Sequence, residues 1–266
     1  VQNLASQGRN LLVRLREPKD LIALNDEAHH VHDEDLAWHR TLTTIHQSLP
    51  NGLSAWLDFS ATPKDQNGTY FPWIVCDYPL AQAVEDRIVK APLIVHQVNR
   101  EEPDRITREN VIPAYREWLL AALERWKEHA TTYKPFNQKP VLFIMAEQNN
   151  FADEIGKWLV EEPDTGLKVD EVLVIHTDRD GEVSKKDLEV AREAARDVDK
   201  ADNPIKAIVS VLMLREGWDV KNVTIVLGLR PFTSKARILP EQAVGRGLRL
   251  IEGIGPDQTQ TLEGMG

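Results

Sequence analysis

Apolar residues in this chain gather into short runs, and stretches with helical periodicity lie between them. Short apolar runs bounded by polar residues are typical of strands buried in a parallel sheet. Strands are therefore predicted at residues 21–26, 53–59, 141–146, 172–176, 207–214 and 223–229. Since strands that alternate with helices form doubly wound parallel sheets, the pattern predicts an α/β fold.

The helices between these strands are indicated by periodicity and by end signals. One helical face carries Tyr115, Trp118, Leu119, Ala122, Leu123 and Trp126. Pro50 and Gly52 end an earlier helix, and Pro240 suits the first position of a later one. Helices are predicted at residues 38–49, 80–86, 151–160, 184–200 and 240–249, and around residues 115–126.

A polar and charged run at residues 99–109 separates two parts of the chain. Residues 70–98, just before it, are apolar and interrupted by prolines, as in a passage out of a domain. The part after it alternates regularly between helix and strand. Two domains are therefore predicted, residues 1–98 and residues 110–266.

Polar residues follow several predicted strands. Asp26, Ser60 and Asp219 fall at carboxyl ends, where doubly wound sheets bind their ligands. Ser60 and Thr62 supply two hydroxyl groups. These hydroxyls could hydrogen-bond a carboxylate on the neighbouring strand, or they could start the turn before Pro63.

Composition narrows the class of protein. The 266 residues are 42% apolar and 28% charged, which is typical of a globular protein. The one cysteine, Cys76, excludes a disulfide framework and fits a reducing, cytoplasmic compartment. No apolar run approaches the ~18 residues of a membrane span. The start without methionine suggests a piece of a longer polypeptide.

Charge is distributed unevenly. The chain carries −10, yet residues 205–251 hold eight basic and three acidic side chains, a balance of +5. A basic segment in an acidic protein is a candidate for binding phosphate, on a nucleotide or on nucleic acid. A solvated basic face is the alternative. The overall acidity argues against nonspecific coating of DNA.

The first candidate site is Asp26-Glu27-Ala28-His29. An Asp at the end of a buried strand can hold Mg²⁺, usually through water. An adjacent Glu can orient or deprotonate the water that attacks a terminal phosphate. An acidic loop without such a role is the alternative.

A second interpretation of this region uses its histidines. His29, His30, His32 and Asp33 offer imidazole and carboxylate ligands for a zinc or iron hydrolase. Consecutive histidines point in different directions, so one metal rarely takes them all. The phosphate interpretation is therefore preferred.

The second candidate site lies on the predicted helix at residues 240–249. Positions three and four apart share a helical face, so Gln242, Gly245, Arg246 and Arg249 point the same way. Gly245 and Gly247 each cost the helix about 1 kcal/mol relative to Ala, which suggests close approach of another backbone or a ligand. Forked guanidinium groups suit phosphate oxygens. Arginines paired with the acidic remainder of the chain are the alternative.

Taken in order, these segments resemble motifs II to VI of DEAD/DEAH-type superfamily 2 helicases. The resemblance rests on Asp-Glu-Ala-His at residues 26–29, Ser-Ala-Thr at 60–62, the strand at 141–148, Glu-Gly-Trp-Asp at 216–219 and Gln-x-x-Gly-Arg-x-x-Arg at 242–249. The particular forms look most like the Res subunits of type III restriction enzymes. The resemblance implies two RecA-like parallel-sheet domains of the P-loop NTPase type, with ATP between them and nucleic acid across both.

The resemblance also implies roles in the first domain. Asp26 would serve Mg²⁺, and Glu27 would be the catalytic carboxylate. His29, Ser60 and Thr62 would couple the nucleotide state to the DNA-binding surface.

Roles in the second domain follow in the same way. Gly217 and Asp219 would approach the nucleotide, and Gln242 would face its phosphates. Arg246 and Arg249 would be arginine fingers. Double-stranded DNA and a methylation or specificity subunit are the partners that the resemblance implies.

One family motif, the phosphate-binding loop GxxxxGK followed by Ser or Thr, does not occur. The Gly156-Lys157 pair is followed by Trp158, and Phe151 stands where the first glycine belongs. Because 25 residues precede Asp26, the first domain is expected to be truncated. A nuclease domain is also missing, so this chain is expected not to hydrolyse ATP or cut DNA by itself.

The sequence thus predicts part of an ATP-dependent DNA helicase or translocase of a restriction system. A non-catalytic nucleic-acid-binding or regulatory remnant of a helicase is the first alternative. A histidine-ligated metal hydrolase is the second.

Overall fold

The computed structural model of the chain forms two compact units. It describes residues 20–26, 28, 37–61, 63–64, 69–95, 105–175, 194, 197–200, 202–211, 220–229, 245, 247–255 and 258–265. The first unit holds the described residues up to Cys76, and the second begins at Asp77. Within these described ranges, no helix is long and apolar enough to cross a membrane.

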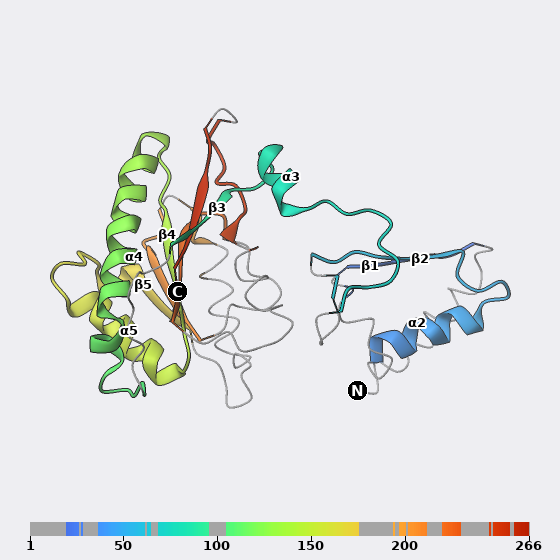
Figure 1. Ribbon diagram of the computed structural model, residues 1–266, viewed down its shortest axis with the longest axis horizontal. Helices are drawn as coiled ribbons and strands as arrows, with labels where there is room; N and C mark the ends of the chain where they lie inside the picture. Colours follow the sequence, from blue (N-terminus) through green and yellow to red (C-terminus); the bar gives the residue numbers. More distant parts are fainter. Residues whose placement is uncertain are drawn as a thin grey trace. The chain divides into compact units, whose positions relative to one another are not determined.

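A six-stranded sheet forms the centre of the second unit (Figure 1). Its strands are β3 (Ala91–Val95), β4 (Val141–Ala146), β5 (Val172–Ile175), β6 (Ala207–Ser210), β7 (Val223–Leu229) and β8 (Thr261–Met265). The spatial order is β3-β8-β7-β4-β6-β5, and all neighbouring strands are parallel. The predicted α/β fold with a parallel sheet is therefore confirmed.

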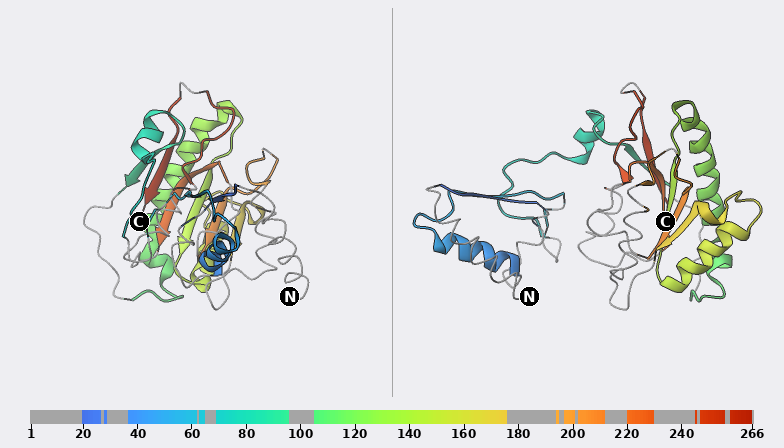
Figure 2. Two further views of the ribbon diagram at one scale, coloured as in Figure 1. Left: turned by 90° about the vertical axis from the view of Figure 1, so that its right-hand side faces the viewer. Right: turned by 180° about the vertical axis from the view of Figure 1, so that it is seen from behind.

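Two helices cover one face of this sheet (Figure 1, Figure 2). They are α4 (Val111–Tyr133) and α5 (Asn149–Glu161). All six residues of the predicted apolar face on α4 are buried, and they pack with Leu142, Ile144 and Ala146 of β4. Every residue of β4 is buried, which explains why its sequence is an unbroken apolar run.

The opposite face of the sheet has its own apolar cluster. Val141, Phe143 and Met145 of β4 point into it, since side chains alternate along a strand. Val198, Leu248 and others contact this second cluster. Residues 176–193 and 230–244, which hold most of the two later predicted helices, lie outside the described residues.

Strands β3 and β8 were not predicted. The β3 sequence contains Pro92, and that of β8 contains Glu263 and Gly264, so neither has a strong strand pattern. Pro92 is tolerated because β3 is an edge strand, where a missing N–H costs no ladder bond on the open side. Both strands form through pairing between distant parts of the chain, with Ala91 opposite Thr261.

The division between the units differs from the predicted domains, residues 1–98 and 110–266. Helix α3 (Leu80–Glu85) and β3 belong to the second unit, although they precede the predicted boundary. The physical reason is that β3 is hydrogen-bonded along its whole length to β8. Short 3-10 helices at Lys134–Phe136 and Val169–Glu171 complete the described elements of this unit.

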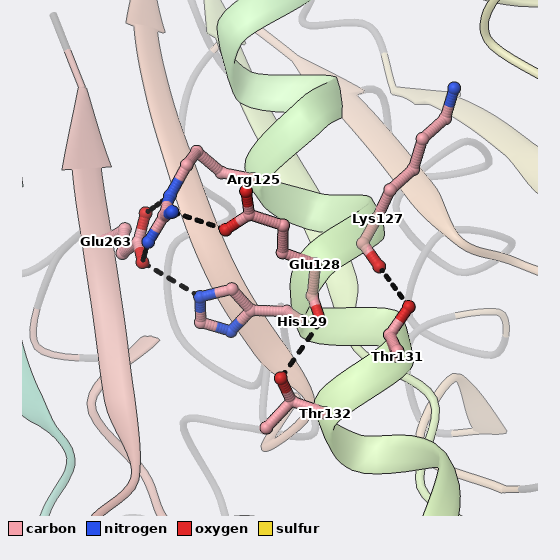
Figure 3. Close-up of polar contacts among 7 residues, drawn as sticks. All are labelled: Arg125, Lys127, Glu128, His129, Thr131, Thr132 and Glu263. Atoms are coloured by element: carbon pink, nitrogen blue, oxygen red, sulfur yellow. Dashed lines mark hydrogen bonds and ion pairs between the residues drawn. The ribbon is translucent and has the colours of Figure 1, made fainter.

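A buried acid fixes α4 to β8 (Figure 3). Glu263 is 2% exposed, and Arg125 donates to both of its carboxylate oxygens, at 2.8 and 2.5 Å. Nε2 of His129 lies 3.0 Å from Oε1 of Glu263. The Arg125 hydrogen bond holds the pKa of Glu263 below its ordinary value of 4.5, against the opposing effect of burial. Glu128 also pairs with Arg125, but at the exposed side of the helix.

The first unit contains a smaller parallel sheet. It consists of β1 (Ile22–Asn25) and β2 (Ala55–Asp58), with α2 (Ala37–Ser48) between them in sequence. The turn after α2 needs Gly52, whose φ is +71° and whose added Cβ would meet His46 at 2.6 Å. This turn confirms the predicted end of the helix.

One expectation for β1 was wrong. A buried strand was predicted, but Ile22 and Leu24 are 56% and 66% exposed. They alternate with the half-buried Ala23 and buried Asn25, so β1 is covered on one face only. Its one described neighbour strand, β2, pairs beside it in the sheet and therefore does not cover the face that carries Ile22 and Leu24.

Replacing Glu263 with Gln should destabilise the second unit. Removing one partner of a buried ion pair is costly, although Arg125 is 42% exposed and therefore partly screened. We expect the free energy of unfolding to fall by about 2 kcal/mol at pH 7. A lowered carboxylate pKa contributes stability above pH ~4.5 and loses it as pH falls through the folded-state value. The difference between wild type and variant, measured by urea unfolding, should therefore shrink below pH ~4.5.

Glu128→Gln is the matched control. It removes the other carboxylate that pairs with Arg125, but this carboxylate is 55% exposed. We expect Glu128→Gln to lower the free energy of unfolding by less than about 1 kcal/mol, both at pH 7 and below pH ~4.5. Equal losses in the two variants would contradict a special role for Glu263.

Candidate functional site

The structure brings two predicted site residues to one edge of the first unit. Parallel pairing of Asn25 with Asp58 places the carboxyl ends of β1 and β2 side by side. Asp26 follows the first strand directly, and Ser60 follows the second by two residues. The Ala28 N–H donates to the Phe59 carbonyl at 3.0 Å, which ties the segment after Asp26 to the segment before Ser60.

Asn25 and Asp58 form a polar pair at this end of the sheet, which was not predicted from the sequence. Asn25 is 4% exposed, and its Nδ2 donates to Oδ1 of Asp58 at 2.7 Å. Nε1 of Trp56 donates to the same Asp58 oxygen, also at 2.7 Å. The pair links the last residues of the two strands, so it fixes the backbone from which Asp26 leaves. A polar residue ending each strand was its one signal in the sequence.

The chemistry of this edge suits a hydrated cation. Asp26 is exposed, and a carboxylate that reaches solvent at a strand end can bind Mg²⁺ that retains its waters. Glu27, His29 and Thr62 lie outside the described residues.

The metal-ligand set of the alternative interpretation is not described either. His29, His30, His32 and Asp33 all lie outside the described residues. Among the described residues, no three His, Cys, Asp or Glu side chains are grouped to hold a metal ion.

In the second unit, four predicted site residues lie outside the described part of the chain: Gly217, Asp219, Gln242 and Arg246. The strand before the first two is described. β6 ends at Ser210, opposite Met145 of β4, so both strands finish at the carboxyl edge of the sheet.

The backbone of Arg249 lies at the opposite end of the sheet, where strand β3 begins. It forms an antiparallel bridge with Val89, and the Leu248 carbonyl accepts the Lys90 N–H at 2.7 Å. Both contacts precede the first residue of β3. A strand of five residues is about 16 Å long, so the backbone of Arg249 is far from the carboxyl edge.

The two glycines beside the arginines have different surroundings. Gly245 and Gly247 are both helical. A Cβ on Gly247 would meet the terminal methyl groups of Leu262 at 2.9 and 3.0 Å, whereas one on Gly245 would meet nothing within 4 Å. A close approach is therefore found at Gly247, but the approaching group is a side chain of β8 and not the backbone or ligand that was expected.

Lys90 is a fully buried lysine in this region, and it was not predicted from the sequence as a site residue. It is 0% exposed, and its Nζ donates to the carbonyls of Lys221 and Val223 at 2.5 Å and of Gly247 at 3.0 Å. Burial lowers its pKa to about 7, although Asp199 acts in the opposite direction. A lone lysine inside the apolar run from Ile88 to Val95 was the signal in the sequence.

The fold is similar to that of solved helicases. The Mycobacterium smegmatis helicase Lhr, in a structure bound to ssDNA and AMP-PNP, matches 96% of this chain at 14% identity with a TM-score of 0.52. The match covers 30% of the Lhr chain. The yeast DEAD-box splicing factor Prp28 matches 92% of this chain and 46% of its own at 12% identity, but its TM-score of 0.36 supports no argument. No protein family and no curated protein matches the chain in sequence.

The likeness to Lhr concerns the fold. The chain has the mixed α/β architecture of RecA-like helicase domains, with the six-stranded parallel sheet described above. It spans less than a third of the length of the Lhr chain.

Alanine substitutions should separate the two glycines. Gly247→Ala must displace Leu262, which is 1% exposed, so we expect the free energy of unfolding to fall by about 1 kcal/mol. Gly245→Ala places its methyl group in open space on a helix, so we expect a gain of up to ~1 kcal/mol. Urea unfolding of both variants tests this difference. The prediction is wrong if Gly247→Ala is the more stable of the two.

Proposed function

We propose that this chain is the part of an ATP-dependent superfamily 2 helicase or translocase that carries motifs II to VI. The whole protein would couple ATP hydrolysis between two RecA-like domains to movement on double-stranded DNA. A restriction system is its proposed setting, with a methylation or specificity subunit as partner, because the motifs look most like those of type III Res subunits.

The observation that carries the proposal is the order of five motif-like segments on a RecA-like fold. Single four-residue matches recur by chance, but five in the family's order cover nearly the whole chain. The likeness to Lhr, a helicase solved with ssDNA and AMP-PNP, supports nucleotide and nucleic acid as ligands.

The first-unit geometry supports the roles proposed for motifs II and III. Asp26 would hold Mg²⁺ through water, and Glu27 would orient or deprotonate the attacking water. The hydrogen bond from the Ala28 N–H to the Phe59 carbonyl would transmit a movement of the backbone at Asp26 to Ser60. Thr62 and His29 would take part in the same coupling. Mg²⁺, when bound, would offset the negative charge of the nucleotide phosphates.

The position of Arg249 supports a role toward a phosphate held outside its own sheet. Its backbone lies at the amino edge, whereas a ligand of the same sheet is expected at the carboxyl edge. By the resemblance to superfamily 2 helicases, Arg246 and Arg249 would act as arginine fingers on the nucleotide. Gln242, Gly217 and Asp219 would contact the same nucleotide.

One observation favours a second function. The 266 residues contain no GxxxxGK[ST] loop, which would favour a non-catalytic nucleic-acid-binding or regulatory remnant if the full-length protein also lacks this loop. This second function predicts that the full-length protein binds DNA but shows no DNA-stimulated ATPase activity.

Substitution of the proposed catalytic groups tests the function in the full-length protein. Glu27→Gln and Arg246→Ala should each lower duplex-stimulated ATP turnover by at least about 100-fold, because each removes a group that acts on the transition state. Thermal unfolding and DNA binding should change little. Turnover is measured by phosphate release with saturating duplex.

Arg116→Ala provides the matched control. Arg116 is a half-exposed arginine of α4 that pairs with Glu162 at 3.5 Å. Its loss should leave turnover within about twofold of wild type. Normal turnover in Glu27→Gln and Arg246→Ala would refute the assigned roles, and absent turnover in wild type would favour the remnant.

A further inference from the structure

Lys90 is a fully buried lysine whose described hydrogen bonds all go to main-chain carbonyls. Its side chain is 0% exposed, and Nζ donates to the carbonyls of Lys221, Val223 and Gly247. Burying an ammonium is costly unless hydrogen bonds replace its water. Three carbonyls at 2.5 to 3.0 Å match the three N–H donors of an ammonium group.

These three carbonyls belong to two separate segments. Lys221 and Val223 lie at the start of β7, just after the Glu216–Asp219 motif in sequence. Gly247 lies two residues before Arg249, on the helical segment that carries the arginine motif. The backbone of Lys90 adds a fourth link, because its N–H donates to Leu248 at 2.7 Å.

We propose that Lys90 is a positioning residue that holds the Gly247–Arg249 segment against the start of β7. The inference rests on the proposed function, because it assigns Lys90 to the arginines of that site. The Lys90 side chain links the start of β7 to Gly247, so it holds the backbone just before Arg249 in a fixed position relative to the sheet.

The choice of lysine has a physical reason. Carbonyls in the last turn of a helix lack amide partners, and a lysine Nζ can donate hydrogen bonds to them. The Leu248 N–H donates to the Gly245 carbonyl at 3.3 Å, and the Gly247 carbonyl accepts a hydrogen bond from Nζ of Lys90. An apolar side chain at position 90 would fill the space but would leave all three carbonyls without this donor.

Neighbouring contacts keep the two segments close without replacing Lys90. Asp199 accepts the Lys221 and Asn222 N–H groups at 2.8 and 2.9 Å, which fixes the approach to β7. Gly247 itself packs against Leu262. These contacts should allow a Lys90 variant to keep its fold while the arginine segment becomes looser.

Hydrogen exchange of the 266-residue chain tests the clamp directly. In Lys90→Met, amides of residues 247–251 and 221–223 should exchange at least about tenfold faster than in wild type. Amides of β4 should keep their protection. Unchanged exchange at residues 247–251 would overturn the clamp, and faster exchange throughout β4 would show general unfolding instead.

Kinetics of the full-length protein test the link to the arginines. If Lys90 positions groups that act in the transition state, Lys90→Met should lower the kcat of duplex-stimulated ATP hydrolysis by about tenfold or more. KM for ATP and the melting temperature should stay close to wild type. A rise in KM at unchanged kcat would contradict positioning of transition-state groups.

Lys139→Met is the matched control. Lys139 is a part-buried lysine of the second unit whose Nζ, like that of Lys90, donates to a main-chain carbonyl, in this case that of Asn203. Its described hydrogen bond goes to neither Gly247 nor the start of β7, so its loss should leave kcat within about twofold. Equal kcat values for the two variants would overturn the inference.

The two proposals fail in different ways. If Arg246→Ala abolishes turnover but Lys90→Met behaves like Lys139→Met, the function stands and the inference fails. If Arg246→Ala has normal turnover, the role proposed for the arginines fails, and if wild type shows no turnover, the proposed function fails, whatever the exchange at residues 247–251 shows.

Discussion

Parallel pairing of β3 with β8 is the constraint on which the second unit depends. It joins a strand that precedes α4 to a strand near the end of the described chain, and β8 in turn pairs with β7. The pairing places Glu263 under α4 and brings Lys90 to the start of β7. Both buried charges therefore follow from the same non-local ladder.

The two charges are stabilised in different ways. Glu263 has a cationic partner in Arg125 and a polar partner in His129, so its charge is offset within the cluster. Lys90 has main-chain carbonyls, which offer partial charges fixed by secondary structure. Such groups cost more than apolar packing would if any partner were missing, so each requires one arrangement of its neighbours. The first fixes a helix to the sheet, and the second fixes the segment before Arg249.

The described site residues occupy different edges of their own sheets. Asp26 and Ser60 follow the carboxyl ends of β1 and β2, where parallel sheets expose backbone and side chains to ligands. The backbone of Arg249 lies at the amino end of β3.

Much of the fold follows from local sequence. β4 and β7 were predicted at their observed bounds, because short, mostly apolar runs bounded by polar residues are typical of strands covered on both faces. The apolar face of α4 and the turn at Gly52 were equally readable. Asp26 and Ser60 could be placed at strand ends, since a strand's direction and end are local properties of the chain.

What only the tertiary structure decided is the set of partners. β3 and β8 have weak strand sequences, and pairing between distant segments makes them strands. The exposure of Ile22 and Leu24, the approach of Leu262 to Gly247 and the burial of Lys90 likewise depend on neighbours far along the chain. Apolar periodicity tells which residues must leave water, but it does not tell which carbonyl, carboxylate or methyl group will meet them there.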